Sequence, residues 1–148
     1  MSCKQNSEII LGLDVGEKTI GVAVSDSLLL TAQGKDVIKR KSLAEDIEAI
    51  QSLIYECHVT KVVIGLPKNM DGSLGDAANT VIQFKQDLEH QIDLPVETLD
   101  ERLTTKLAEQ ALIAADVSRK KRKKVIDKMA AVQILQTYLD RRKSLNSD

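Results

Sequence analysis

The chain has 148 residues, of which 43% are hydrophobic and 29% charged, and its net charge is −1. These values are typical of a globular protein with a buried core. One Phe, two Tyr and no Trp leave few aromatic platforms for stacking single-stranded bases. Two Cys and two His without a Cys-x-x-Cys pair argue against a structural zinc site.

The first eight residues are polar, and no apolar run approaches the roughly 20 residues that cross a bilayer. We therefore expect a cytoplasmic protein with reduced cysteines and no membrane contact. One domain is expected over residues 1–148, with a flexible tail at about 143–148.

Strands are expected first along the chain. The apolar run over residues 9–15 predicts a strand buried on both faces, and after a turn at 16–18 residues 20–25 return as the second strand of a hairpin. A third strand is expected within residues 28–32, with an extension toward Val37. The chain therefore begins with a three-stranded meander.

Helices and strands alternate after this meander. Ser42 is placed to cap a helix, because Glu45 stands in the capping-box position and apolar residues follow at helical spacing. Residues 61–65 and 96–99 predict short strands, and residues 76–91 predict a helix between them.

Two further helices are expected at about residues 104–115 and 124–142, with a basic loop between them. The predicted order is three strands followed by alternating helices and strands. A mixed five-stranded sheet flanked by helices accommodates this order, which indicates the α/β class.

Positive charge gathers in the last part of the chain. Residues 119–148 hold ten Lys or Arg against three Asp, a net of +7, which leaves −8 for residues 1–118. Six consecutive cations are Arg119, Lys120, Lys121, Arg122, Lys123 and Lys124. Such a run can bind phosphates through counterion release, whereas the alternative is a solvated loop.

Asp14 interrupts the first apolar strand. A carboxylate there would cost several kcal/mol unless it is protonated, hydrogen-bonded or bound to a cation. Alternation puts it on the face of Ile10 and Gly12. A turn-forming role is the alternative, because Gly16 follows closely.

Asp127 lies at the centre of the apolar stripe of the last helix. At 100° per residue, Ala131, Ile134 and Tyr138 fall within about 40° of it. A capping carboxylate would lie at the edge of the stripe or outside it. We therefore expect Asp127 to face the sheet beside Asp14.

Asp100 and Glu101 follow the last strand, where α/β folds assemble their sites. Successive residues of a strand point to opposite faces, so only one of the two is expected to reach a shared site. Glu101 is slightly preferred for its longer side chain. Both acids could instead begin the next helix.

Three carboxylates without a histidine set favour a hard cation. Mg²⁺ or Mn²⁺ prefers oxygen ligands and keeps waters, one of which can become a nucleophile. One or two such ions, held by Asp14, Asp127 and Glu101 or Asp100, could support phosphodiester hydrolysis. The residues alone therefore predict a metal-dependent phosphodiesterase.

Four stretches in order resemble the YqgF/RuvX family of 16S rRNA precursor nucleases, also described as Holliday-junction-resolvase-like. They cover nearly the whole chain from about Ile9 to Leu139. These stretches are residues 11–26 (LGLDVGEKTIGVAVSD), 65–67 (GLP) with Asp71-Gly72, 100–105 (DERLTT), and 126–131 (IDKMAA) with Ile134-Leu135.

The resemblance implies a ribonuclease H-like fold, the acids above as metal ligands, and maturation of the 5′ end of 16S rRNA. Ribosomal particles are among the expected partners, and a monomer or weak dimer is expected. Besides the basic run, the residues expected to contact nucleic acid are Lys18, Lys68, Asn69, Arg102 and Thr104.

Three alternatives remain open from the sequence. A resolvase of four-way DNA junctions would share the chemistry but needs two active sites and hence a dimer. A non-catalytic RNA-binding assembly factor would keep the basic run without needing three acids. A nucleotide-binding protein of the sugar-kinase kind resembles the first hairpin but needs two lobes.

Overall fold

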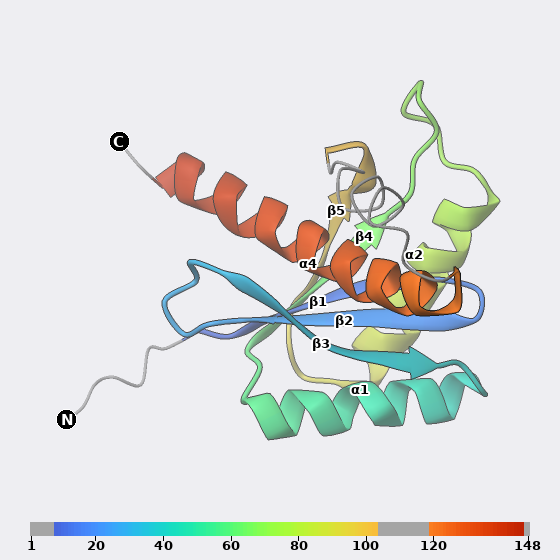
Figure 1. The fold of residues 1–148 in the computed structure, drawn as a ribbon, viewed down its shortest axis with the longest axis horizontal. Helices are drawn as coiled ribbons and strands as arrows, with labels where there is room; N and C mark the ends of the chain where they lie inside the picture. The colour runs from blue at the N-terminus through green and yellow to red at the C-terminus, as the bar shows by residue number, and fades with distance from the viewer. Residues whose placement is uncertain (1–7, 104–118, 147–148) are drawn as a thin grey trace.

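The computed structural model describes the backbone of residues 8–103 and 119–146, and the side chains of residues 8–102 and 128–143. Five strands form one sheet in the order β3-β2-β1-β4-β5 (Figure 1). Strands β1, β2 and β3 pair antiparallel, whereas β1, β4 and β5 pair parallel. The predicted mixed five-stranded sheet is confirmed. The strands are β1 (Ile10–Val15), β2 (Thr19–Ser25), β3 (Ala32–Lys39), β4 (Lys61–Leu66) and β5 (Val96–Asp100).

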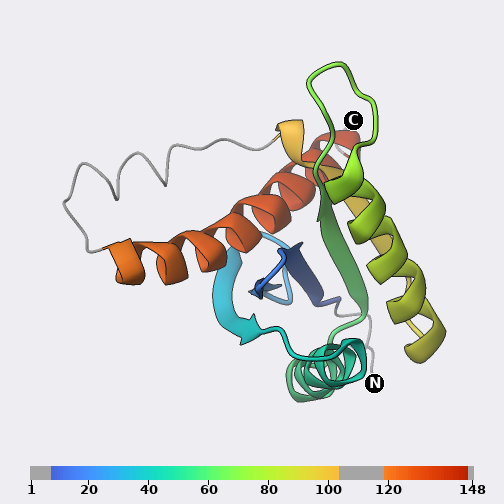
Figure 2. The same cartoon turned by 90° about the vertical axis from the view of Figure 1, so that its right-hand side faces the viewer.

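Helices cover both faces of this sheet. The helices α1 (Leu43–Cys57) and α2 (Asp76–Gln91) lie on one face, and α4 (Arg119–Asn146) crosses the other face obliquely (Figure 2). A short 3₁₀ helix, η2 (Glu101–Leu103), follows β5 directly. None of the helices that the structure describes is long and apolar enough to span a membrane.

Side-chain alternation along the strands divides the core into two layers. The layer between the sheet and α1 and α2 contains Leu11, Leu13, Val62, Ile64 and Phe84, among others. The layer beneath α4 consists of Ile10, Ala23, Val63, Leu99, Ala131, Ile134, Leu135 and Leu139. Because β1 and β4 contribute to both layers, their sequences are continuously apolar rather than alternating.

The predicted limits of α1 and α2 hold closely. The Ser42 hydroxyl accepts a hydrogen bond from the Glu45 amide at 3.1 Å and caps α1 as its sequence indicates. At the other end His58 ends α1 in the left-handed conformation with φ 58°. The helix predicted over residues 76–91 has these bounds in the structure.

The third strand lies later than predicted. Residues 28–31 belong to a turn, in which an Asp26 carboxylate oxygen accepts hydrogen bonds from the amides of Leu30 and Thr31. The following strand, β3, is an exposed edge with little apolar alternation, so its sequence carries a weak strand signal. The strand begins at Ala32, four residues after the expected start at Leu28, whereas the expected extension toward Val37 lies within it.

The last helix is longer than predicted at both ends. It begins at Arg119, so the six consecutive cations form its first turns rather than a loop. Lys and Arg are good helix formers, but a run of them lacks the apolar periodicity that marks a helix. The helix ends at Asn146, beyond the expected Arg142. The helix predicted at 104–115 lies outside the described residues.

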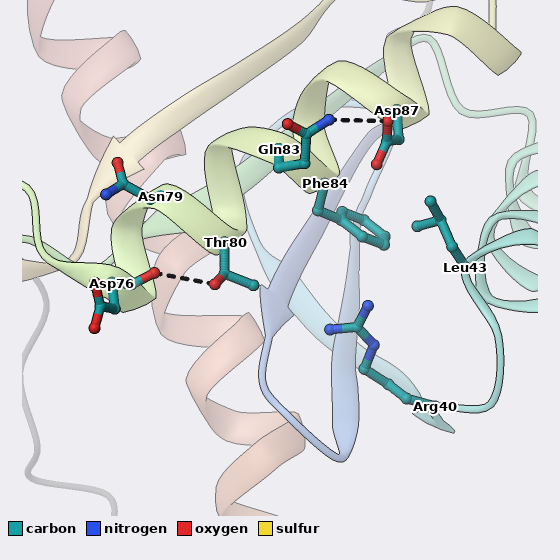
Figure 3. Close-up of a pocket in the computed structure, with 8 residues that line it drawn as sticks. All are labelled: Arg40, Leu43, Asp76, Asn79, Thr80, Gln83, Phe84 and Asp87. Atoms are coloured by element: carbon teal, nitrogen blue, oxygen red, sulfur yellow. Dashed lines mark hydrogen bonds between the residues drawn. The ribbon is translucent and has the colours of Figure 1, made fainter.

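A buried ion pair ties the start of α1 to the end of β3. Asp46, whose side chain is only 2% exposed, accepts hydrogen bonds from Arg40 Nε and from the Lys41 amide, each at 3.0 Å. The Arg40 guanidinium also lies over the Phe84 ring, 5.4 Å from its centroid (Figure 3). Arg40 therefore depends on Asp46 for its charge balance.

Replacing Asp46 by Ala is expected to lower the free energy of unfolding by about 3 kcal/mol, because it leaves a half-buried guanidinium without its partner. Urea unfolding measures this loss. Glu89→Gln is the control, because it breaks the exposed Lys85–Glu89 pair and should cost less than about 0.5 kcal/mol. Equal losses in the two variants would contradict this role of Asp46.

Candidate active site

Asp14 lies near the carboxyl end of β1, the central strand of the sheet, and its side chain is half-buried. Its Cα pairs with Gly21 in β2. On the other side, the parallel register with β4 puts Asp14 beside Gly65, one residue beyond the last paired positions. By alternation Asp14 shares the face of Gly12, which α4 covers. Glycine therefore flanks Asp14 on both neighbouring strands.

Helix α4 packs on β1 where it crosses the sheet obliquely. A Cβ on Gly12 would lie 2.7 Å from Leu135 Cβ and 3.3 Å from the Ala131 carbonyl oxygen. Near the other end of the helix, Arg142 Nη2 contacts Glu8 Oε1, just before β1, at 2.6 Å. From Arg142 back to Ala131, α4 therefore passes from the residue before β1 to Gly12 in its middle.

Asp127 precedes Ala131 by one turn of α4. The side chain of the next residue, Lys128, lies over Gly34 of β3, so this part of α4 has crossed the sheet from β1 toward β3. Ala131, Ile134, Leu135 and Leu139 are buried, and Tyr138 is half-buried, so an apolar stripe faces the sheet; the position of Asp127 at its centre stays a prediction. The Asp127 side chain lies outside the described residues, and its convergence with Asp14 stays a prediction.

Glu101 reaches the same face from β5. It begins η2, its side chain is half-buried, and a Cβ on Gly65 would lie 3.0 Å from Glu101 Cγ. The end of Ile134 occupies the other side of the same space. Glu101 therefore lies over Gly65, and Asp14 lies on the adjacent strand. The missing side chain at Gly65 leaves room on the α4 face for the Glu101 side chain and the end of Ile134.

Asp100 has a different environment. Its two carboxylate oxygens accept hydrogen bonds from the Arg102 amide at 2.9 Å, from Nε at 3.0 and 3.1 Å, and from Nη2 at 2.6 Å. The hydrogen bonds from Arg102 lower the pKa of Asp100 below its ordinary value. Leu99 belongs to the layer under α4, so alternation points Asp100 away from that face.

The donor set suits a hard cation. Among the side chains that the structure describes, no three His, Cys, Asp or Glu residues stand together as a metal site, so Asp14, Asp100 and Glu101 do not form one by themselves. Two carboxylates on the α4 face, with the backbone of a third acid on the helix above, match the oxygen ligands that Mg²⁺ or Mn²⁺ takes. Asp127 would have to complete the set.

The residues expected to contact nucleic acid lie in three places. Lys18 is exposed in the β1–β2 turn, and Lys68 and Asn69 lie in the loop of residues 67–75 after β4. Arg102 is largely engaged by Asp100. Thr104 and the side chains of residues 119–124 lie outside the described part of the chain, so their contacts stay predictions.

A cavity of about 630 Å³ lies between α2 and the connection from β3 to α1 (Figure 3). Its wall contains Phe84, which belongs to the layer on the face opposite to α4. Among the acids whose side chains are described, Asp14, Asp100 and Glu101 do not line this cavity. It is lined by Arg40, Leu43, Asp76, Asn79, Thr80, Gln83, Phe84 and Asp87.

The model of the protein family RuvX, described as Holliday junction resolvase, matches residues 8–141. The chain belongs to this family. A Natranaerobius thermophilus protein named "Putative pre-16S rRNA nuclease" is 61% identical over 139 residues, which are 94% of this chain and 99% of the relative. A protein of the same name from Halalkalibacterium halodurans is 58% identical over 133 residues, 88% of this chain and 95% of the relative. The family resemblance that the four sequence stretches indicate is therefore confirmed.

Solved structures agree on the fold of the RuvX chain. RuvC of T. thermophilus, in complex with a Holliday junction substrate, has a TM-score of 0.59 at 15% identity over 93% of this chain and 96% of its own. RuvC in a separate structure has a TM-score of 0.50 at 13% identity over 92% and 96%. These likenesses confirm the ribonuclease H-like fold that was predicted.

Sequence analysis missed how strongly the loop of residues 67–75 of the RuvX chain is ordered. The Asp71 carboxylate accepts hydrogen bonds from the Ser73 amide at 2.9 Å and hydroxyl at 2.6 Å, and these lower the pKa of Asp71. The Asn69 amide donates to the Ser73 carbonyl at 3.0 Å. An Asp two residues before Ser, beside Gly72, is the turn signal that could have indicated this order.

Proposed function

We propose that this chain is a metal-dependent nuclease that hydrolyses phosphodiester bonds, and that it matures the 5′ end of 16S rRNA precursors. The observation that carries the chemistry is the placement of Asp14 and Glu101 on either side of Gly65, beneath the helix that bears Asp127. The names of its close relatives support the substrate. The enzyme would be a hydrolase acting on ester bonds.

Asp14, Glu101 and Asp127 would hold one or two Mg²⁺ or Mn²⁺ ions. When bound, such ions supply charge neutralisation at the phosphate and activation of water. The protein contributes fixed carboxylates on rigid elements: the central strand for Asp14, and the junction of β5 and η2 for Glu101. Fixed geometry of this kind is what metal sites need.

The beginning of α4 would hold the nucleic acid. Its six cations are helical, so they form charged turns directly before Asp127. Cations there can bind the phosphate backbone on both sides of the scissile bond without reading its sequence. Lys18, Lys68 and Asn69 would extend this surface across the carboxyl edge of the sheet.

Incubation of the purified protein and Mn²⁺ with 16S rRNA precursor fragments and with four-way DNA junctions tests this function. Cleavage of the precursor near the mature 5′ end supports it. Preferred cleavage of junctions would instead favour a resolvase, the activity by which the RuvX family is described. Binding without any cleavage would indicate a non-catalytic assembly factor. A cytoplasmic monomer or weak dimer acting on ribosomal particles fits the proposal.

If residues 119–124 bind phosphates, changing Lys120, Lys121 and Lys123 to Gln should weaken binding to any nucleic acid of similar length. The slope of log affinity against log salt should flatten by up to about one unit per lost contact. Turnover at saturating substrate should change much less. Fluorescence anisotropy at several salt concentrations measures the slope.

The matched control removes three cations far from the site, and its binding should stay close to that of the parent. This control combines Lys85→Gln, Arg141→Gln and Lys143→Gln. If the variant at the start of α4 binds nucleic acid with the affinity and salt slope of the parent, residues 119–124 are solvated cations that do not bind phosphate.

A further inference from the structure

Arg102 joins two segments that meet at the carboxyl edge of the sheet. Three of its guanidinium contacts go to Asp100, and Nη1 donates a hydrogen bond to the Met70 carbonyl at 3.2 Å. The same guanidinium lies against Gly72, whose φ of 88° suits glycine; a Cβ there would be 3.5 Å from Nη1. Arg102 therefore ties the loop of residues 67–75 to the end of β5.

Asp100 also fixes the backbone on either side of Glu101. One oxygen of its carboxylate accepts the Arg102 amide at 2.9 Å, which closes a local turn around the residue between them. Glu101 is at the end of an edge strand and in a single short turn of 3₁₀ helix. This turn sets the direction in which the Glu101 side chain leaves the backbone, with its Cγ over Gly65.

We propose that Asp100 and Arg102 are positioning residues: Asp100 sets the place of Glu101, and Arg102 locks the loop of residues 67–75 beside it. Asp100 is then not a metal ligand, and the Arg102 guanidinium is not a primary phosphate contact. Arg102 holds the loop through the Met70 carbonyl, while the Met70 side chain is 91% exposed to solvent. One ion pair thus fixes both a proposed metal ligand and a proposed substrate-facing loop.

This inference rests on the proposed function only for the role of Glu101. Residues that orient a metal ligand through hydrogen bonds typically contribute 10- to 100-fold in metal affinity or activity. A carboxylate that binds the metal itself differs from such a positioning residue, because metal binding requires its negative charge. Asn at position 100 can still accept the Arg102 amide, whereas Ala cannot, so the two substitutions separate positioning from ligation.

The test compares Asp100→Ala, Asp100→Asn and Asp14→Asn with the parent. Mn²⁺ affinity is measured by calorimetry, and amide hydrogen exchange of residues 69–73 and of Arg102 is measured without metal. Asp93→Asn, which removes an exposed charge elsewhere, is the control. Asp100→Ala should lower Mn²⁺ affinity by roughly 10- to 100-fold and speed exchange in the loop. Asp100→Asn should stay within about tenfold of the parent in affinity.

Two results would overturn the inference. An Asp100→Asn variant that loses Mn²⁺ binding as completely as Asp14→Asn would make Asp100 a ligand. An Asp100→Ala variant with parental affinity and exchange would leave the ion pair without a positioning role. Two further outcomes would refute the proposed metal site, and with it the role of Glu101. They are Mn²⁺ binding by Asp14→Asn with the affinity of the parent, and no Mn²⁺ binding by the parent itself. The exchange data would still decide whether Arg102 locks the loop.

Discussion

Asp14→Asn is expected to abolish Mg²⁺- or Mn²⁺-dependent cleavage while the protein stays folded. The substitution keeps the shape of the side chain on the central strand and removes the charge that a cation needs. Because Glu101 lies on the same face, loss of one negative charge also relieves repulsion in the protein without metal. The thermal midpoint without metal should therefore hold or rise.

Single-turnover cleavage assays and thermal unfolding check the two parts of this prediction. Glu17→Gln is the matched control, since it removes an exposed carboxylate from the turn that follows β1 and should leave turnover near the parental value. Undiminished turnover in Asp14→Asn would exclude Asp14 as a ligand. A fall in midpoint with lost activity would indicate a structural role instead.

Gly12→Ala should reduce both stability and turnover, because it pushes α4 away from the sheet. The new Cβ would lie 2.7 Å from Leu135 Cβ, an atom fixed by the helix backbone, so the helix itself has to shift. Overpacking of this kind costs about 1–3 kcal/mol. If α4 carries the ligand Asp127, a displacement of about 1 Å should also lower turnover by roughly 100-fold.

Gly75→Ala is the control for the stability effect of Gly12→Ala. A Cβ on Gly75 would make ordinary contact with Asn69 at 3.5 Å, and the backbone there is extended, so stability should change by less than about 0.5 kcal/mol. Urea unfolding and saturating-substrate assays measure both variants. Full turnover in a destabilised Gly12→Ala protein would show that the position of α4 does not matter to the chemistry.

Much of the fold follows from local signals in the sequence. Continuous apolar runs predict β1 and β4 because both faces of these strands are covered, and Ser42 with Glu45 predicts the start of α1 through a specific cap. The parity of Gly12 and Asp14 on β1 also follows from alternation alone. These features depend on near neighbours in the chain.

The errors arise where a local signal is weak. Strand β3 is an exposed edge stabilised by pairing with β2, and its polar sequence does not show this. The first turns of α4 are a run of cations without apolar spacing, so they were taken for a loop.

The sequence predicts which acids form the candidate site, and this stays a prediction; it does not predict how Asp100 and Glu101 differ in their surroundings. Alternation indicated that Asp100 and Glu101 point to opposite faces without deciding between them. The two acids differ in the structure through Gly65, which lies beneath Glu101, and Arg102, which pairs with Asp100. Contacts of this kind between distant segments leave no periodic pattern in the sequence.

Anomalous scattering from crystals soaked in Mn²⁺ tests the metal site most directly, because it locates the ion without reference to activity. We expect a peak bounded by carboxylate oxygens of Asp14, Glu101 and Asp127, at the about 2 Å separations typical of small divalent ions. Asp100 should remain on Arg102. A peak elsewhere, or an Asp127 side chain that points to solvent away from Asp14, would contradict the assignment of these three acids as the active site.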